Sequence, residues 1–204
     1  MIPAVILRIE KYTESLMSLM IRPSDPNYRW IAGQWVDVAI LPDFRMAGYS
    51  FCSPTGSGSF SLLIRKSSHP VTQWIYSSAA IGSNLFIGEA SGSCVYKPEE
   101  QEEIVCFAGG IGITPMISIT RTARRLGKKH TLYHSIKTQE ENVFAQEIPK
   151  DCVYISDRID FHKLVSNHPS SAHFFVCGPK EFIDEGVDAL EKHNCVHIHY
   201  ERWW

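Results

Sequence analysis

A glycine-rich turn between an apolar strand and a helix is the feature that most constrains this fold. Residues 104–108 are continuously apolar, as in a parallel strand that is buried on both faces. Gly109, Gly110 and Gly112 follow, and Pro115 has the fixed φ that suits the first turn of a helix. Such a turn lets the backbone approach a phosphate closely, and the next helix offers free N–H groups. A tight turn without a ligand has the same pattern.

The rest of the second half alternates apolar strands with amphipathic helices, which is typical of a parallel sheet. We expect strands at 104–108, 130–135, 152–156, 173–177 and 196–200, and helices near 115–126, 138–147, 161–167 and 180–193. Thr138 followed by Glu141 has the spacing of a capping box, which favours a helix start at that point.

The first half has short alternating segments separated by turn residues, the pattern of a small antiparallel barrel. We expect strands at 5–12, 15–22, 33–40, 48–53, 60–66 and 84–88, and one short helix that begins at Pro70. An acidic stretch at 99–103 separates the two patterns. We therefore expect an antiparallel β-barrel domain over residues 1–98 and an α/β domain with a parallel sheet over residues 99–204.

Length and charge limit the classes of function. The 204 residues suffice for two small domains, and a formal net charge of −2 gives no electrostatic argument for nucleic acid or an anionic membrane as partner. No apolar run reaches the roughly 20 residues of a membrane span, and the N-terminus lacks the pattern of a targeting signal. Six cysteines are scattered without a Cys-x-x-Cys pair. We expect a cytoplasmic protein without a metal centre.

Two clusters of residues each allow a structural and a functional interpretation. His193, Cys195, His197 and His199 alternate, as metal ligands on one face of a strand would, but the run spans a helix end and has no closed four-ligand spacing. The basic residues between 121 and 129 are consistent with a solvated helix end, or with a docking patch for an acidic electron carrier.

The pattern Gly-Gly-x-Gly-x-x-Pro at 109–115 resembles the nicotinamide-domain loop of the ferredoxin–NADP reductase superfamily. Cys-Gly-Pro at 177–179, after another apolar strand, resembles that superfamily's second nicotinamide-contacting turn. The resemblance implies that NADH or NADPH contacts Gly109, Gly110, Gly112, Ile113, Thr114, Pro115, Cys177, Gly178 and Pro179. Ser135 and Lys137 follow the strand 130–135, and no acidic residue there is placed to reject a 2′-phosphate, so the choice between the two nucleotides stays open.

Residues 45–54 resemble the flavin strand Arg-x-Tyr-Ser of the same superfamily. The resemblance implies that Tyr49 and Phe51 hold the flavin and that the Ser50 hydroxyl bonds near its reactive nitrogen. Core packing on alternating strand positions is the alternative for both aromatic rings. The family arginine stands two residues before the tyrosine, where this chain has Ala47, so Arg45 is a doubtful substitute.

The next flavin segment of the superfamily is a strand that leads into a helix whose N-terminus receives a phosphate, and residues 60–74 resemble it. The flavin contacts that this resemblance implies are Ile64, Arg65, Lys66, Val71 and Thr72. Arg65 or Lys66 could replace the missing arginine. Thr72 would add a hydroxyl in the first turn, and an ordinary cap-region threonine is its alternative.

The whole chain resembles a narrower group, the oxidoreductase NAD-binding-domain-containing proteins, in Gly-Tyr-Ser-Phe-Cys-Ser at 48–53 and Glu-Arg-Trp-Trp at 201–204. In the superfamily a terminal aromatic residue shields the flavin, which implies that role for Trp204, with burial against the last strand as the alternative. Cys177 and Glu201 are implied to lie near the hydride-transfer site together with Ser50.

These resemblances imply a flavin-dependent NAD(P)H oxidoreductase. It would hold FAD, with FMN as the alternative, and pass electrons from the nicotinamide nucleotide to an unidentified acceptor, such as a ferredoxin-like or flavodoxin-like protein carrier. The alternative is a non-catalytic nucleotide-binding or assembly subunit of the same fold without flavin. The missing arginine before Tyr49 is the main support for that alternative.

Overall fold

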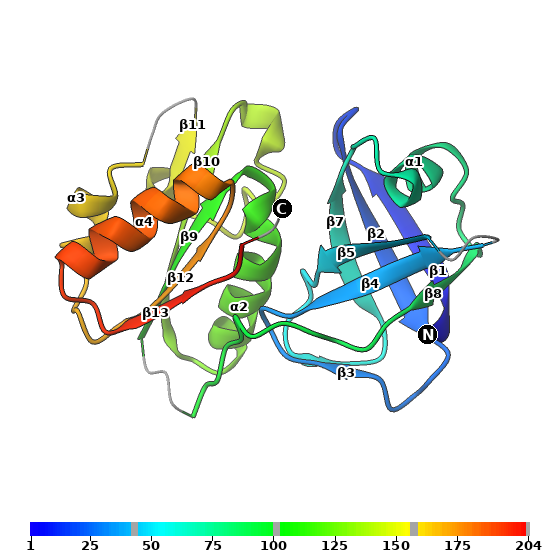
Figure 1. Ribbon diagram of the computed structural model, residues 1–204, viewed down its shortest axis with the longest axis horizontal. Helices are drawn as coiled ribbons and strands as arrows, with labels where there is room; N and C mark the ends of the chain where they lie inside the picture. The colour runs from blue at the N-terminus through cyan, green and yellow to red at the C-terminus, as the bar shows by residue number, and fades with distance from the viewer. Residues whose placement is uncertain (42–44, 100–102, 156–158, 203–204) are drawn as a thin grey trace.

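The computed structural model describes residues 1–41, 45–99, 103–155 and 159–202. It contains an antiparallel sheet in the first half of the chain and a parallel sheet in the second half, side by side (Figure 1). This architecture confirms the predicted fold class.

The antiparallel sheet has the strand order β5-β4-β8-β1-β2-β7. Its strands are β1 (Ile2–Lys11), β2 (Leu16–Pro23), β4 (Trp35–Ile40), β5 (Arg45–Ser50), β7 (Phe60–Arg65) and β8 (Asn84–Ile87). The two edge strands meet just beyond β5, where Phe51 pairs with Leu62, so the sheet curls into a barrel. The helix α1 (Pro70–Ser77) packs against β5 and β4.

A second, two-stranded sheet in the first half was not predicted. It pairs β3 (Arg29–Trp30) with β6 (Gly56–Ser57). Strands of two residues show no periodicity, so the alternation of apolar and polar residues cannot reveal them. The Trp30 ring stacks on Phe51 with ring centroids 5.4 Å apart, which ties this small sheet to the barrel core.

The parallel sheet has the strand order β11-β10-β9-β12-β13. Its strands are β9 (Glu103–Gly109), β10 (Lys129–Ile136), β11 (Val153–Ile155), β12 (His173–Cys177) and β13 (His197–Tyr200). The helices are α2 (Ile113–Arg125), α3 (Phe161–Val165) and α4 (Lys180–Lys192), and the 3-10 turns are η1 (Gly110–Gly112), η2 (Gln139–Glu141) and η3 (Lys150–Cys152).

The helices cover both faces of the parallel sheet, because its strands are apolar on both faces. Cys106 of β9 belongs to one core cluster with Met116 of α2. Phe107, the next residue, belongs to the opposite cluster with Phe161 of α3 and Ile183 of α4. The helix α2 lies on the side of the sheet that faces the barrel, and α3 and α4 lie on the far side (Figure 1).

The predicted helix at 138–147 is wrong. The turn η2 and further hydrogen-bonded turns over 143–147 form there instead, and Thr138 makes no side-chain cap. Glu141, the expected capping partner, instead accepts the backbone N–H of Lys137 and pairs with Arg65 of the barrel. A capping box is a local signal, and here a contact with a distant strand takes the carboxylate that the cap would need.

Hydrogen bonds from α2 fasten the parallel sheet to the barrel. Thr122 Oγ1 accepts the backbone N–H of Thr55 at 2.9 Å, and Arg121 donates to the carbonyl oxygen of Cys52 at 2.8 Å. Ser118 donates its hydroxyl proton to the carbonyl oxygen of Ser53. These hydrogen bonds hold α2, and with it the parallel sheet, against the barrel. The domain boundary between residues 98 and 99 remains a proposal.

Among the described residues, no helix has the length and apolar character needed to cross a membrane.

Candidate functional site

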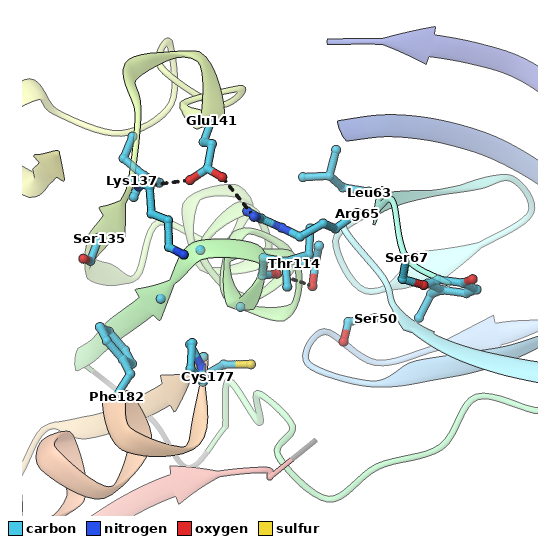
Figure 2. Close-up of a pocket in the computed structure, with 18 of the residues that line it drawn as sticks. Ser50, Leu63, Arg65, Ser67, Thr114, Ser135, Lys137, Glu141, Cys177 and Phe182 are labelled. Carbon is cyan, nitrogen blue, oxygen red and sulfur yellow. Dashed lines mark hydrogen bonds and ion pairs between the residues drawn. The ribbon is translucent and has the colours of Figure 1, made fainter. Parts of the chain in front are cut away.

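A cleft of about 970 Å³ lies between the barrel and the parallel sheet, within the size range of small-molecule sites (Figure 2). Its position follows from the strand order. The chain leaves the central strand β9 for β10 on one side and reaches β12 on the other, so the carboxyl ends of β9 and β12 border a crevice. Open parallel sheets bind their ligands at such a point.

The two glycine turns meet at this crevice because they lack side chains. A Cβ on Gly112 would lie 2.3 Å from the carbonyl oxygen of Cys177, closer than any real contact. Gly110 differs, since it has φ +53° and a Cβ there would meet only the tip of Arg65, at 3.6 Å. Gly112 thus allows the turns to touch, whereas Gly110 leaves its surroundings open to a ligand.

The N-terminus of α2 adds the positive end of a helix dipole to the same wall. Gly112 is its N-cap, and no described side chain caps the first turn. Thr114 lines the cleft and donates its hydroxyl proton to the carbonyl oxygen of Ile111 at 3.0 Å, so it does not cap the helix. Free N–H groups at the positive end of a helix dipole make a ready site for an anion.

The barrel wall of the cleft carries the Tyr-Ser pair. Tyr49 and Ser50 both line it, and the Tyr49 hydroxyl lies 2.8 Å from Oγ1 of Thr72 in the first turn of α1. Burial raises the pKa of Tyr49, although the Thr72 hydrogen bond opposes the shift. Nδ1 of His69 accepts the backbone N–H of Val71, which caps α1 at the edge of the cleft.

An ion pair crosses the cleft from one half of the chain to the other. Nη1 of Arg65 on β7 lies 2.9 Å from Oε1 of Glu141 in η2. Burial by itself would raise the pKa of Glu141, but the backbone N–H of Lys137 and the Arg65 guanidinium outweigh it and hold the pKa below its usual value. Glu141 is therefore a carboxylate at neutral pH.

A small hollow that is too tight for a water molecule adjoins the cleft, since Ser50 and Cys177 line both. Glu201 and Pro115 also line the hollow. Burial, reinforced by Glu201, raises the pKa of Cys177 to about 12, so this thiol stays protonated. Burial also raises the pKa of Glu201, against a hydrogen bond from Trp35. The structure thus brings the three expected hydride-site residues Ser50, Cys177 and Glu201 together.

The structure sorts the other expected contact residues by location. The expected residues that line the cleft are Tyr49, Ser50, Arg65, Thr72, Gly109, Gly110, Gly112, Thr114, Ser135, Lys137, Cys177, Gly178 and Pro179. Those buried in the hydrophobic cores instead are Phe51, Ile64, Val71 and Ile113. Arg45 is exposed at the start of β5, and Lys66 is exposed with its ammonium over the Tyr76 ring. Trp204 lies outside the described residues.

Sequence reasoning missed several residues of the cleft. They are Ala47, Gly48, Leu63, Ser67, His69, Ile111, Ile136, Glu141 and Phe182. His69 directly precedes Pro70, a helix-start signal that could have identified it as a cap. Phe182 gives no such signal, because its proximity to Gly109 follows only from the packing of α4.

The alternating histidines do not form one cluster. His193 faces His162 with ring centroids 5.4 Å apart, whereas His199 Nε2 lies 3.0 Å from Nδ1 of His173. His197 stacks on His173 at 4.1 Å. Within the part of the chain that the structure describes, no group of three or more His, Cys, Asp or Glu side chains is arranged as a metal site.

The basic cluster at the end of α2 is largely paired. Arg121 binds Glu147 through two nitrogens, at 2.8 and 2.6 Å, and Arg124 donates to the backbone carbonyl of Glu147. Lys129 pairs with Glu103 at 2.8 Å. These contacts favour a structural role over a docking patch.

Comparison with known sequences supports the resemblance that the motifs indicate. No protein-family model matches the chain. A relative from Pongo abelii, "Oxidoreductase NAD-binding domain-containing protein 1", is 24% identical over 236 residues, which cover 93% of this chain and 76% of the relative. The expected similarity to proteins of that name is confirmed.

Solved structures show the same fold. Phthalate dioxygenase reductase, described as a modular structure for electron transfer from pyridine nucleotides to [2Fe-2S], superposes with a TM-score of 0.85 at 21% identity, over 98% of this chain and 67% of that one. A ferredoxin NADP+ reductase from Neisseria gonorrhoeae with bound FAD and NADP gives a TM-score of 0.80 at 19% identity, over 98% and 97% of the two chains. The chain shares the fold of these two reductases.

Proposed function

We propose that this chain is a flavin-dependent NAD(P)H oxidoreductase that passes electrons from the nicotinamide nucleotide to a further acceptor. The observation that supports the proposal is that one cleft is lined by Tyr49 and Ser50 of the barrel and by Gly110 to Gly112 at the end of β9, the segments proposed for the flavin and for the nucleotide. Transfer between two bound rings depends on their juxtaposition, and a shared cleft provides it.

The residues present fit a flavin and a dinucleotide. Gly110 leaves open space, the first turn of α2 has donors that no described side chain caps, and Nε of Arg65 is buried without a partner among the described residues. Each of these features suits an anionic group such as a diphosphate. When bound, the flavin supplies the chemistry, since it accepts a hydride and passes the two electrons onward.

The chain itself binds and orients the reactants. The α2 N-terminus and the turn at 177–179 would hold the nicotinamide nucleotide, and Tyr49, supported by Thr72, would hold the flavin. Ser50 and Cys177 border both hollows and would position the reacting rings, with Cys177 acting as a neutral thiol. Glu201 lies beside them.

The flavin, the nucleotide and the electron acceptor are proposed by analogy with proteins of similar structure. FAD is the proposed flavin, with FMN as the alternative, and either NADH or NADPH is the donor. A protein carrier is the proposed acceptor, by analogy with the reductase described as passing electrons to [2Fe-2S]. The proposed location is the cytoplasm. A non-catalytic subunit is not proposed, because Arg65 supplies a cation to the cleft that Ala47 does not.

The visible spectrum of the purified protein tests this function. It is recorded without oxygen after incubation with FAD or FMN and removal of free flavin, and again after addition of NADH or NADPH. Retained flavin that bleaches supports the proposal, and the nucleotide that bleaches it faster is the preferred donor. Failure to retain either flavin contradicts the proposal.

A further inference from the structure

The ion pair between Arg65 and Glu141 stands where the proposed function places the cofactors. Arg65 ends a barrel strand, and Glu141 ends the turn η2 that follows the strand β10. Figure 2 shows the two side chains pointing toward each other, with one Glu141 oxygen on Arg65 and the other on the backbone N–H of Lys137. The pair therefore connects the two walls of the cleft.

Arg65 has N–H donors that the ion pair with Glu141 does not use. A guanidinium has five N–H donors in a planar fork that matches phosphate oxygens. Its Nε is buried and has no partner among the described residues, while its Nη2 lies 3.6 Å from the place of a Cβ on Gly110. The guanidinium thus stands beside the turn that leaves room for a ligand.

Glu141 already puts a negative charge at this point. Its side chain is only 13% exposed, and its pKa is held below the usual value, so it carries that charge at neutral pH. A diphosphate that enters the cleft would need the same guanidinium. The N–H groups that Arg65 turns toward the Glu141 carboxylate are not available to phosphate oxygens at the same time, so the carboxylate and the diphosphate compete for Arg65.

We propose that the Glu141 carboxylate competes with a dinucleotide for Arg65. Glu141 binds the Arg65 guanidinium before a dinucleotide enters the cleft, and the diphosphate of the dinucleotide then displaces Glu141 from it. The inference rests on the proposed function and adds a residue that sets affinity. It follows that Glu141 weakens binding of the dinucleotide, and that its neutralisation strengthens binding.

Isothermal titration calorimetry tests this inference with two ligands that carry a diphosphate, ADP-ribose and FAD. Wild type is compared with E141Q and with E140Q, a matched control that makes the same charge change on the exposed neighbour. We expect E141Q to tighten one of the two ligands about fivefold, since the lost competitor is a partly exposed ion pair. E140Q should change neither affinity by more than about twofold. The ligand that responds identifies which dinucleotide Arg65 serves.

Further variants separate competition from simple repulsion. R65Q should weaken the same ligand, and R65Q/E141Q should bind as weakly as R65Q, because Glu141 acts through Arg65. If E141Q does not fold, E141D shortens the carboxylate and should tighten binding to a smaller degree.

Three results overturn the inference. They are equal affinities of E141Q and E140Q, weaker binding by E141Q, and a tightening that persists when Arg65 is absent. If wild type binds both ligands and one of these results is found, the inference fails and the proposed function stands. If wild type binds no flavin and no ADP-ribose, both fail.

Discussion

Replacing Gly112 with alanine tests whether the contact between the two glycine turns builds the site. Gly112 has φ −60°, so alanine brings no backbone strain there. Its Cβ would lie 2.3 Å from the Cys177 carbonyl oxygen and 2.7 Å from the Gly178 nitrogen, against an ordinary contact of at least 3.4 Å. The turns must therefore separate by about 1 Å. Because both sides are backbone, we expect the upper end of overpacking costs, about 3 kcal/mol.

That cost should lower the melting temperature by roughly 6–12 °C for a chain of this size, as measured by thermal unfolding. A displacement of 1 Å should also reduce kcat/KM for the nicotinamide nucleotide about 100-fold. Gly110→Ala is the control, because it places alanine at φ +53° in open space and should cost only about 1 kcal/mol. A G112A protein with the melting temperature of the wild type, or one that loses no more stability than G110A, would refute the reasoning.

Three further outcomes follow from the packing and the electrostatics. Burial and two neighbouring histidines lower the pKa of His199 from 6.5 to about 4, so the unfolded chain takes up this proton first and stability should fall as pH drops from 6.5 toward 4. Urea unfolding should show a flatter pH dependence in H199F, and an unchanged slope would contradict this. Arg121→Met should lower the free energy of unfolding by about 2–3 kcal/mol. The loss should exceed that of Arg124→Met, because the charged contact of Arg124 with Glu147 is longer. Equal losses in urea titrations would contradict a stabilising role of the Arg121–Glu147 pair. Tyr49→Phe removes the 2.8 Å contact with Thr72 and should weaken FAD binding about two- to tenfold in a fluorescence titration, whereas unchanged affinity would place the flavin elsewhere.

Local chemistry was enough to predict the glycine turn at 109–112 and the elements around it. A buried apolar strand followed by glycines predicts a tight turn into a helix, and the turn η1 connects β9 to α2 there. The close contact of Gly112 with the Cys177 carbonyl was not predicted. Apolar residues at helical spacing predicted the buried faces of α2 and α4, since Met116 and Ile183 are fully or almost fully buried. The turn and the buried helix faces depend on residues that are close together in the sequence, so local patterns are enough to predict them.

The contacts across the cleft could not be predicted in this way. Thr138 and Glu141 have the spacing of a cap, yet the carboxylate reaches Arg65, which comes from the other half of the chain. The spacing rule could not anticipate that partner, because it arises only when the barrel packs against the parallel sheet. The burial of Phe51 against Trp30 and Phe60 likewise depends on the closure of the barrel.

The proposed function depends on direct hydride transfer from the nicotinamide to the flavin within one cleft. The most direct measurement is the rate at which NADH or NADPH bleaches the bound flavin in a single turnover without oxygen, with the nucleotide carrying either hydrogen or deuterium on C4 of the nicotinamide ring. We expect bleaching to be slower with deuterium at the transferred position, because the bond from C4 to that atom breaks in the step observed. A flavin that stays oxidised with both nucleotides would contradict it.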